Sequence, residues 1–464
     1  MMSEKMFENK LESPRDIPQV EVVLSAQELA PYVVAYSRPF VTNVIRETFD
    51  HYRSLLKDGT SVDGSEVLDA ILGNLERERF KFFNRVINCS GIVIHTNLGR
   101  SPLGKARAEV LAERLSGYSN LEYDILPGKR GKRGRHVSRL FAMLAGSEAA
   151  CVVNNNAAAV YLILNTFCSG RECVVSRSEL VQIGGGFRMP DVMRASGAIL
   201  QEVGTTNRAA FDDYFRAVND KTGLIAKIHW SNFRIEGFTE SVEASQLAQL
   251  GREKGIPVMF DLGSGSWLRP EEYGAKDEPS ISSAIESKVD LVCFSGDKLF
   301  GGPQAGIVLG RNDRIEMLLK NPLYRAFRPD KMTLFLLEET LLTYLSGKAT
   351  SDIPALSLLT TPLNLLKMRA DRICGSLKNA GIASSIVETT ALVGGGSAPE
   401  EKLESLGVRL DMKTDPDELA ARFRKANPPV IGRIIDDCYV LDLKAVFKDE
   451  DDELIEVIKD VIRS

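Results

Sequence analysis

The sequence has few of the residue patterns that mark metal sites, disulfide scaffolds or membrane spans. Its 464 residues hold four histidines and seven cysteines, and no two of the cysteines form a C-x-x-C pair. We therefore expect no metal site, and we expect the cysteines, most of which lie within apolar runs, to be reduced as in a cytoplasmic protein. The longest apolar run, around "AAAVYLILNTFC", is too short to cross a bilayer, so we expect no membrane partner.

A strong net charge and the common nucleotide-binding motifs are also missing. The formal net charge is −5, so composition gives no indication of a nucleic-acid or anionic-membrane partner. The first residues, "MMSEKMFENKLESPRD", are charged and lack the apolar stretch of a signal peptide, which again predicts a cytoplasmic location. "GSGSWL" lacks the third glycine of a dinucleotide fingerprint, and no GK[ST] phosphate loop is present.

The patterns that are present change twice along the chain and predict three domains. Residues 1–80 repeat apolar positions at helical spacing, as in "GSEVLDAILGNLERERFKFF", and predict a small helical domain. Residues 81–330 alternate short apolar strands with amphipathic helices, which predicts an α/β domain with a mostly parallel sheet. Residues 331–464 begin with long helices and continue with short strands, and we expect a smaller α+β domain there.

Polar clusters follow the predicted strands, and ligands of parallel sheets bind at such strand ends. In "FSGDKLFGG", Lys298 lies between an apolar strand and a glycine-rich turn, and Ser295 precedes it by three residues. A lysine held there can form a Schiff base with an aldehyde cofactor while the serine hydroxyl contacts a phosphate. Ser-x-x-Lys is a weak pattern by itself, so a structural lysine is the alternative.

Other strand ends supply matching partners. Asp261 ends "PVMFD", where a buried carboxylate needs a partner such as a pyridinium nitrogen; a turn-capping aspartate is the alternative. "VVNNNAAAVYLIL" runs through Asn155, Asn156 and Ala157 into a helix whose first N–H groups suit a phosphate. In "HWSNFR", Asn232 is placed to reach the phenolic oxygen of the cofactor, or to form a turn. Phosphate site, aspartate and lysine in this order are the pattern of a fold type I pyridoxal phosphate enzyme.

Many motifs in one order resemble the bacterial selenocysteine synthase family, the L-seryl-tRNA(Sec) selenium transferases. They are "RVINCSGIVIHTNLGRSPL", "NNNAAAVYLILNT", "SRSELVQIGGGFRMPDVM", "EVGTTNR", "SNFRIEGFT", "DLGSGS", "FSGDKLFGGPQAGIVLG", "RAFRPDKMTL" and "NPPVIGRIIDDCYVLDL". The resemblance extends over nearly the whole chain, including the helical N-terminus. The sequence departs from it at Gln182, where we expect an acidic residue, so the role of that side chain stays open.

The resemblance implies a fold type I transferase with pyridoxal 5'-phosphate as cofactor and seryl-tRNA(Sec) as substrate. Such an enzyme eliminates the serine hydroxyl and adds selenium from selenophosphate, which gives selenocysteinyl-tRNA(Sec). By similarity, Lys298 is the Schiff-base lysine and Asp297 is a catalytic candidate. The arginines that the resemblance assigns to the anionic selenium donor are Arg100, Arg133, Arg325 and Arg328. Guanidinium groups suit such a donor because they bind anions through paired hydrogen bonds.

The resemblance also implies partners and leaves two alternatives. Fold type I sites usually take residues from two subunits, so we expect at least a dimer, and the family suggests a ring of dimers. We expect residues 1–80 to bind the tRNA by shape, which agrees with the low net charge, and the basic run "PGKRGKRGR" is a second candidate for binding phosphates. The alternatives are a related lyase acting on a small phosphorylated amino-sugar acid and a non-catalytic tRNA-binding homologue.

Overall fold

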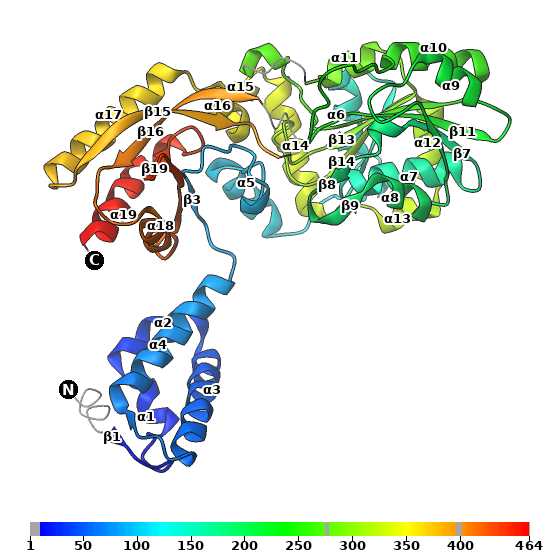
Figure 1. Ribbon diagram of the computed structural model, residues 1–464. Helices are drawn as coiled ribbons and strands as arrows, with labels where there is room; N and C mark the ends of the chain where they lie inside the picture. Colours follow the sequence, from blue (N-terminus) through cyan, green and yellow to red (C-terminus); the bar gives the residue numbers. More distant parts are fainter. Residues whose placement is uncertain (1–9, 274–277, 396–400, 464) are drawn as a thin grey trace. The chain divides into compact units, whose positions relative to one another are not determined.

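The computed structural model describes residues 10–273, 278–395 and 401–463. The chain forms two compact units, residues 1–85 and residues 86–464. Figure 1 draws the first unit in blue, and the second runs from cyan to red. Within the described ranges, no helix is both long and apolar enough to cross a membrane.

The first unit is helical, as the spacing of its apolar residues predicts. Its elements are β1 (Lys10–Leu11), α1 (Val20–Leu24), η2 (Gln27–Leu29), α2 (Ala30–Tyr36), α3 (Arg38–Lys57), β2 (Val62–Asp63) and α4 (Gly64–Lys81). Val41, Ile45 and Phe49 recur every fourth residue of α3, and all three are fully buried. Val67 and Ile71 repeat this spacing on α4 and belong to the same apolar core. The short strands β1 and β2 form an antiparallel pair that the sequence pattern does not predict.

The second unit is organised around a seven-stranded sheet with the order β10-β7-β11-β12-β13-β14-β6. The strands are β6 (Ala149–Val153), β7 (Glu172–Ser176), β10 (Ile199–Val203), β11 (Thr222–Ile228), β12 (Val258–Gly263), β13 (Leu291–Ser295) and β14 (Gly306–Gly310). β10, β7, β11, β12 and β13 pair in parallel, and β14 is antiparallel to both of its neighbours. The predicted mostly parallel sheet is therefore confirmed.

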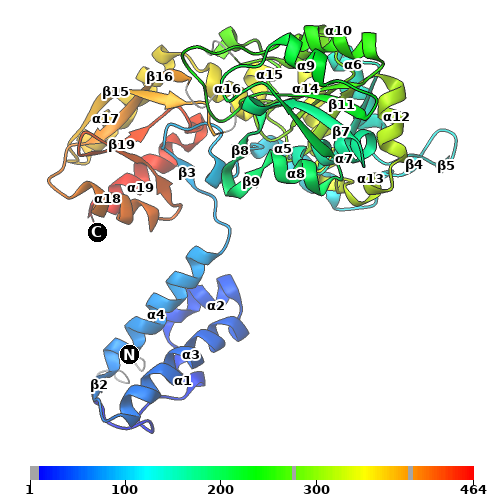
Figure 2. The same ribbon diagram turned by 45° about the vertical axis from the view of Figure 1, so that its right-hand side comes forward.

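Helices cover both faces of this sheet (Figures 1 and 2). α6 (Arg135–Ala145), α11 (Ile281–Glu286) and α14 (Lys331–Leu345) contribute to the core on one face, and α7 (Asn156–Cys168), α8 (Met189–Ala195) and α12 (Asn312–Lys320) contribute to the core on the other. Adjacent residues of a strand serve opposite cores, so that Val152 belongs to the first and Val153 to the second. Burial on both faces explains why the strands are continuous apolar runs in the sequence.

Shorter elements connect the layers and surround the strand ends. They are α5 (Lys105–Leu115), β4 (Tyr123–Asp124), β5 (Lys129–Arg130), β8 (Gln182–Ile183), β9 (Phe187–Arg188), α9 (Phe211–Ala217), α10 (Ala244–Lys254), α13 (Pro322–Ala326), α15 (Ala349–Asp352) and α16 (Pro354–Thr360). β4 and β5 form a hairpin that carries part of the basic run identified in the sequence.

The C-terminal part of the second unit contains a four-stranded sheet with the order β15-β16-β19-β18. Its elements are α17 (Leu363–Asn379), β15 (Ser384–Leu392), β16 (Lys402–Leu410), α18 (Pro416–Arg424), β17 (Val430–Ile431), β18 (Arg433–Ile435), β19 (Cys438–Asp442) and α19 (Asp451–Arg463). β3 (Ile87–Asn88) pairs in parallel with β17, so the first residues of this unit lie beside some of its last.

The expected domain boundary at residue 330 does not coincide with a division of the structure. Leu334, Leu337 and Leu341 of α14 are buried in the same core as the central sheet. Without this helix, part of one face of the sheet would be exposed to water. An apolar helical pattern predicts that the helix is buried, but it does not specify the surface against which the helix packs.

Candidate active site

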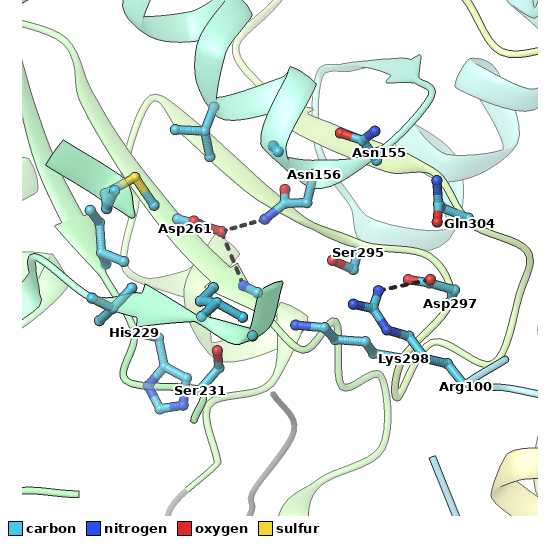
Figure 3. Close-up of a pocket in the computed structure, with 18 residues that line it drawn as sticks. Arg100, Asn155, Asn156, His229, Ser231, Asp261, Ser295, Asp297, Lys298 and Gln304 are labelled. Atoms are coloured by element: carbon cyan, nitrogen blue, oxygen red, sulfur yellow. Dashed lines mark hydrogen bonds and ion pairs between the residues drawn. The ribbon is translucent and has the colours of Figure 1, made fainter. Parts of the chain in front are cut away.

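A cavity of about 260 Å³ lies at the carboxyl ends of the central strands, where polar side chains from distant parts of the chain converge (Figure 3). Asn155 and Asn156 follow β6, and His229 follows β11. Asp261 lies near the end of β12, and Lys298 follows β13. The structure thus brings together the strand-end residues that the sequence pattern singles out.

Asp261 forms the most deeply buried charged wall of this cavity. Asn156 Nδ2 donates a hydrogen bond of 2.8 Å to Asp261 Oδ1, and the backbone N–H of Gly263 donates one of 3.1 Å to the same oxygen. Burial raises the pKa of the Asp261 carboxyl, while the hydrogen bond from Asn156 and the charge of Lys298 act in the opposite direction. A cationic ligand atom beside this carboxylate would therefore reduce the cost of its burial.

Lys298 is 5% exposed and lies in the turn after β13. Burial, followed by the charge of Arg100, lowers the pKa of its amine, and the carboxylates of Asp261, Asp297 and Glu278 only partly oppose this effect. A lysine with a lowered pKa is more often uncharged, and the uncharged amine is the nucleophile that attacks an aldehyde.

A glycine keeps the space beside this amine open. A Cβ atom on Gly263 would lie 3.2 Å from Ser231 Oγ and 4.0 Å from Lys298 Nζ, and the φ angle of Gly263 is +67°. Any other side chain at this position would be strained and would enter the cavity.

Arg100 and Ser101 connect the segment after β3 to the segment that carries Lys298. Arg100 Nη1 lies 2.9 Å from Asp297 Oδ2 in an ion pair. Ser101 Oγ donates a hydrogen bond of 2.6 Å to the backbone oxygen of Lys298, and the Ser101 N–H donates one of 3.2 Å to that of Asp297. Arg100 has a φ angle of +62°, a left-handed conformation that is uncommon outside glycine. These contacts fix the guanidinium beside Lys298.

The N-terminus of α7 lies at the cavity, as expected for an anion site. Asn155 is its N-cap residue, and its side-chain oxygen accepts a hydrogen bond of 2.8 Å from the N–H of Ala158. Asn155 and Ala157 line the cavity, and Ser295 at the end of β13 lines it as well. The side chain of Asn156, in contrast, is committed to Asp261.

The remaining arginines lie elsewhere in the single chain. Arg133, Arg325 and Arg328 line a second cavity of about 850 Å³, which shares no lining residue with the first. Other cationic residues in its lining are Arg130, Lys132, Arg135 and Lys320. Glu122 lies 3.5 Å from Arg133 and 3.7 Å from Arg328, and the Nε atoms of both arginines are buried without a hydrogen-bond partner among the described residues. Unused donors in a cationic cavity suit a multiply charged anion.

Asn232 does not line the Lys298 cavity. Its Nδ2 donates a hydrogen bond of 2.8 Å to the backbone oxygen of Gln182. The Gln182 side chain in turn accepts a hydrogen bond of 2.9 Å from Arg188 Nε. Asn232 therefore holds the β8–β9 segment, and the expected contact with a cofactor oxygen is not formed by this arrangement.

Sequence reasoning missed two residues of the site. His229 lines the cavity, and Ser101 anchors the backbone of Lys298. A histidine directly after a strand was a signal for the first. A lone serine gave no signal for the second, because its contact joins residues 197 positions apart.

Comparisons with known proteins agree over nearly the whole chain. A family model described as L-seryl-tRNA selenium transferase matches residues 86–447, and one described as the selenocysteine synthase N terminal matches residues 14–53. The L-seryl-tRNA(Sec) selenium transferase of Carboxydothermus hydrogenoformans is 43% identical over 444 residues, which cover 94% of this chain and 95% of the relative. The enzyme of the same name from Clostridium botulinum is 42% identical over 97% of this chain and 98% of its own.

Among solved structures, a D-glucosaminate-6-phosphate ammonia-lyase has a similar fold. The TM-score is 0.58 with 16% sequence identity, and the match covers 83% of this chain and 97% of the lyase. At this identity the likeness concerns the fold alone.

Proposed function

This chain belongs to the L-seryl-tRNA selenium transferase family, and we propose that it performs the family's reaction with pyridoxal 5'-phosphate held in the Lys298 cavity. It is a selenium transferase, which converts seryl-tRNA(Sec) to selenocysteinyl-tRNA(Sec). Its fold is that of fold type I enzymes, as the sequence predicts.

The residues of the Lys298 cavity fit this cofactor. Lys298 offers a buried amine of lowered pKa to the aldehyde, and Asp261 offers a buried carboxylate to the ring nitrogen. The N-terminus of α7, with Asn155 and Ala157 at the cavity, is suited to the phosphate, and Ser295 adds a hydroxyl. The observation that carries the proposal is the convergence of Lys298 and Asp261 on one cavity beside this helix start.

The protein's own residues then have distinct tasks. When bound, pyridoxal phosphate supplies an electron sink that stabilises negative charge at the α-carbon of the seryl group. Lys298 binds the cofactor and is the base that accepts the α-proton, because its lowered pKa favours the uncharged amine. Asp261 holds the protonated ring nitrogen in place.

Arg100 and Asp297 act beside Lys298. An acid is needed for the departing hydroxyl, but Asp297 is ion-paired with Arg100, and an ionised carboxylate accepts hydrogen bonds rather than donating them. We therefore assign Asp297 to holding the Arg100 guanidinium at the cavity. There the guanidinium can bind an anionic group of the incoming donor.

The selenium donor is selenophosphate in this proposal, and Arg133, Arg325 and Arg328 help to bind it. These three lie in the second cavity rather than beside Lys298 of the same chain. A second copy of the chain that places its arginine cavity against the Lys298 cavity would complete the site. The functional assembly is accordingly at least a dimer, and a ring of dimers is the expected larger form.

The first unit, residues 1–85, is proposed to bind the tRNA. The part of it that matches the selenocysteine synthase N-terminal family lies in α1–α3 and the residues before them. Selecting one tRNA requires contacts far from a single seryl group, and RNA is recognised largely through its shape. Free cysteines throughout the described chain agree with a cytoplasmic location, which we also propose.

The alternatives are not favoured. A lyase of small amino-sugar acids shares the fold, but at 16% identity that likeness does not bear on substrate. The relatives that match more than nine-tenths of the chain are selenium transferases. A non-catalytic tRNA-binding role leaves the buried amine and carboxylate of the cavity without a use.

The test is replacement of Lys298. The Lys298→Ala protein, mixed with pyridoxal phosphate, should show no visible absorbance of lysine-bound cofactor and no turnover, while its melting temperature stays within a few degrees of wild type. Lys348→Ala, at an exposed site, is the matched control and should behave as wild type. Borohydride reduction of the loaded wild-type protein, followed by peptide mass analysis, should locate the cofactor on Lys298. Retained visible absorbance in Lys298→Ala would rule this lysine out.

A further inference from the structure

One polar pair at the Lys298 cavity has no part in the function described so far. His229 follows β11 and lines the cavity together with Ser231 (Figure 3). Its backbone N–H donates a hydrogen bond of 2.9 Å to the backbone oxygen of Asp261, which ties the histidine to the strand that carries the aspartate. Its ring atom Nε2 lies 3.2 Å from Glu278 Oε2.

Glu278 is buried in a way that packing alone does not explain. Its side chain is 3% exposed, and Oε1 is buried without a hydrogen-bond partner among the described residues. A buried carboxylate that uses only one oxygen is costly, and an apolar residue of similar size would avoid that cost. Its single contact is to a ring that lines the cavity.

The pair also lies within electrostatic reach of the reactive lysine. The charge of Glu278 is one of three carboxylate charges that act on the Lys298 amine, against the opposing charge of Arg100. A second buried glutamate, Glu179, also lies within reach of the His229 ring, but it is engaged by Lys227 Nζ and the backbone N–H of Ile228. Glu278 is therefore the carboxylate whose hydrogen bonding is given to His229.

A carboxylate on one ring nitrogen determines what the other nitrogen can do. When Nε2–H donates to Glu278, the neutral imidazole has its lone pair on Nδ1, which then accepts hydrogen bonds. The same arrangement of carboxylate and imidazole fixes the tautomer in metal sites and in hydrolase active sites. A seryl substrate brings both hydroxyl and ammonium hydrogens that such an acceptor can bind.

We propose that His229 is a further residue of the binding site, with Nδ1 accepting a hydrogen bond from a hydroxyl or ammonium group of the bound ligand, and that Glu278 is its positioning residue. This rests on the proposed function for the identity of the ligand. The arrangement of the pair itself does not depend on the cofactor.

The four histidines of the chain make the pair directly observable. Nitrogen NMR of the full-length protein with labelled histidine, without cofactor, should show His229 protonated at Nε2 and not at Nδ1, with its signal identified by loss in His229→Asn. Glu278→Gln should change the His229 tautomer ratio or its nitrogen shifts. The matched control is Glu338→Gln, because His136 Nε2 lies 3.1 Å from Glu338 Oε1 in a pair with 65% and 24% exposed side chains, away from this cavity. Glu338→Gln should leave the His229 signals unchanged.

Ligand binding provides the second measurement. Addition of pyridoxal phosphate and then serine amide, a small seryl probe, to the wild-type protein should shift His229 Nδ1 and leave His136 unchanged. Glu278→Gln should weaken binding of the seryl probe about tenfold, the loss expected for one misdirected hydrogen bond to a charged group, while the visible absorbance of the bound cofactor remains. Glu278→Asp should restore part of this affinity.

The outcomes separate the two proposals. A wild-type His229 protonated at Nδ1, or signals that Glu278→Gln does not alter, would overturn the positioning role whether or not the cofactor binds. A His229 signal that does not respond to the seryl probe on the loaded protein would overturn its role in binding. Absence of any visible absorbance on adding pyridoxal phosphate to wild type would instead overturn the proposed function, and the tautomer measurement would still decide the pair.

Discussion

At the residue scale, the active site consists of ionisable groups held in surroundings that disfavour their charge. Burial raises the pKa of Asp261 and lowers the pKa of Lys298, so each group is shifted toward its neutral form in the folded chain. Groups of this kind reduce stability in exchange for reactivity, and such sites are common where catalysis occurs. The stability of the protein should therefore report on the lysine directly.

Lys298→Met should stabilise the cofactor-free protein near pH 7 by about 0.5–2 kcal/mol. The folded state holds the lysine proton less tightly than the unfolded state, because the pKa of Lys298 is lowered on folding. The penalty is therefore fully present below the folded pKa and disappears as the pH rises toward the ordinary lysine value of about 10.4. Denaturant unfolding at pH 7 and pH 10 checks this. A gain of equal size at both values would assign it to packing and contradict the charge explanation.

At the scale of elements, the approach of β14 to the start of α7 shapes the proposed phosphate site. A Cβ atom on Gly306 would lie 2.2 Å from the backbone oxygen of Asn155, the N-cap residue of α7. Backbone atoms cannot move aside without disturbing the helix start. The glycine thus lets strand and helix meet at the cavity.

Gly306→Ala should destabilise the protein by about 1–3 kcal/mol and weaken pyridoxal phosphate binding, because the clash falls on the α7 N-cap. Gly375→Ala is the matched control, since Gly375 lies inside α17 with no atom within 4 Å of the added Cβ. That control should stabilise the protein by about 0.5–1 kcal/mol. Thermal unfolding and a cofactor titration measure both effects. Normal cofactor affinity in Gly306→Ala would show that the α7 start does not hold the phosphate.

The segment around α13 carries two arginines proposed to bind the selenium donor. Arg325→Ala and Arg328→Ala should each reduce use of selenophosphate about ten- to a hundred-fold, the effect of losing a charged hydrogen bond of about 1.5–3 kcal/mol. Elimination of the serine hydroxyl, measured without the donor, should change much less. Arg311→Ala, on the exposed side of the same region and paired with Asp313, serves as control. Equal losses in both half-reactions would point to a structural role for Arg325 and Arg328.

At the scale of the whole molecule, the two compact units separate the proposed recognition of tRNA from the chemistry. Residues 1–85 have their own apolar core, and the lining of the Lys298 cavity comes entirely from the second unit. The two tasks should therefore be separable by truncation.

A protein lacking residues 1–85 should keep the visible absorbance of bound pyridoxal phosphate and lose tight binding of seryl-tRNA(Sec). Fluorescence titration with labelled tRNA measures the second effect, and ordinary seryl-tRNA(Ser) controls for specificity. Unchanged affinity would move tRNA recognition to the second unit, where the basic residues near β5 are the next candidates. Loss of the absorbance as well would mean that the second unit needs the first in order to fold.

The sequence by itself determined the parts of this protein that follow from local pattern. Apolar runs that alternate with helices predicted the parallel sheet, because burial on both faces requires such runs. The strand-end rule placed Lys298, Asp261 and Asn155 in one site, because parallel strands end at a common edge. Residue type then gave the chemistry, since an amine, a carboxylate and a helix start match the three parts of the cofactor.

Only the tertiary structure decided which side chains meet across long separations. The ion pair of Arg100 with Asp297 joins residues 197 positions apart, and the contact of His229 with Glu278 joins two different loops. The tertiary structure also placed Arg325 in a different cavity from Lys298 and packed α14 against the central sheet. Periodicity reports whether a side chain faces water or a core, but the partner of each side chain depends on the path of the whole chain.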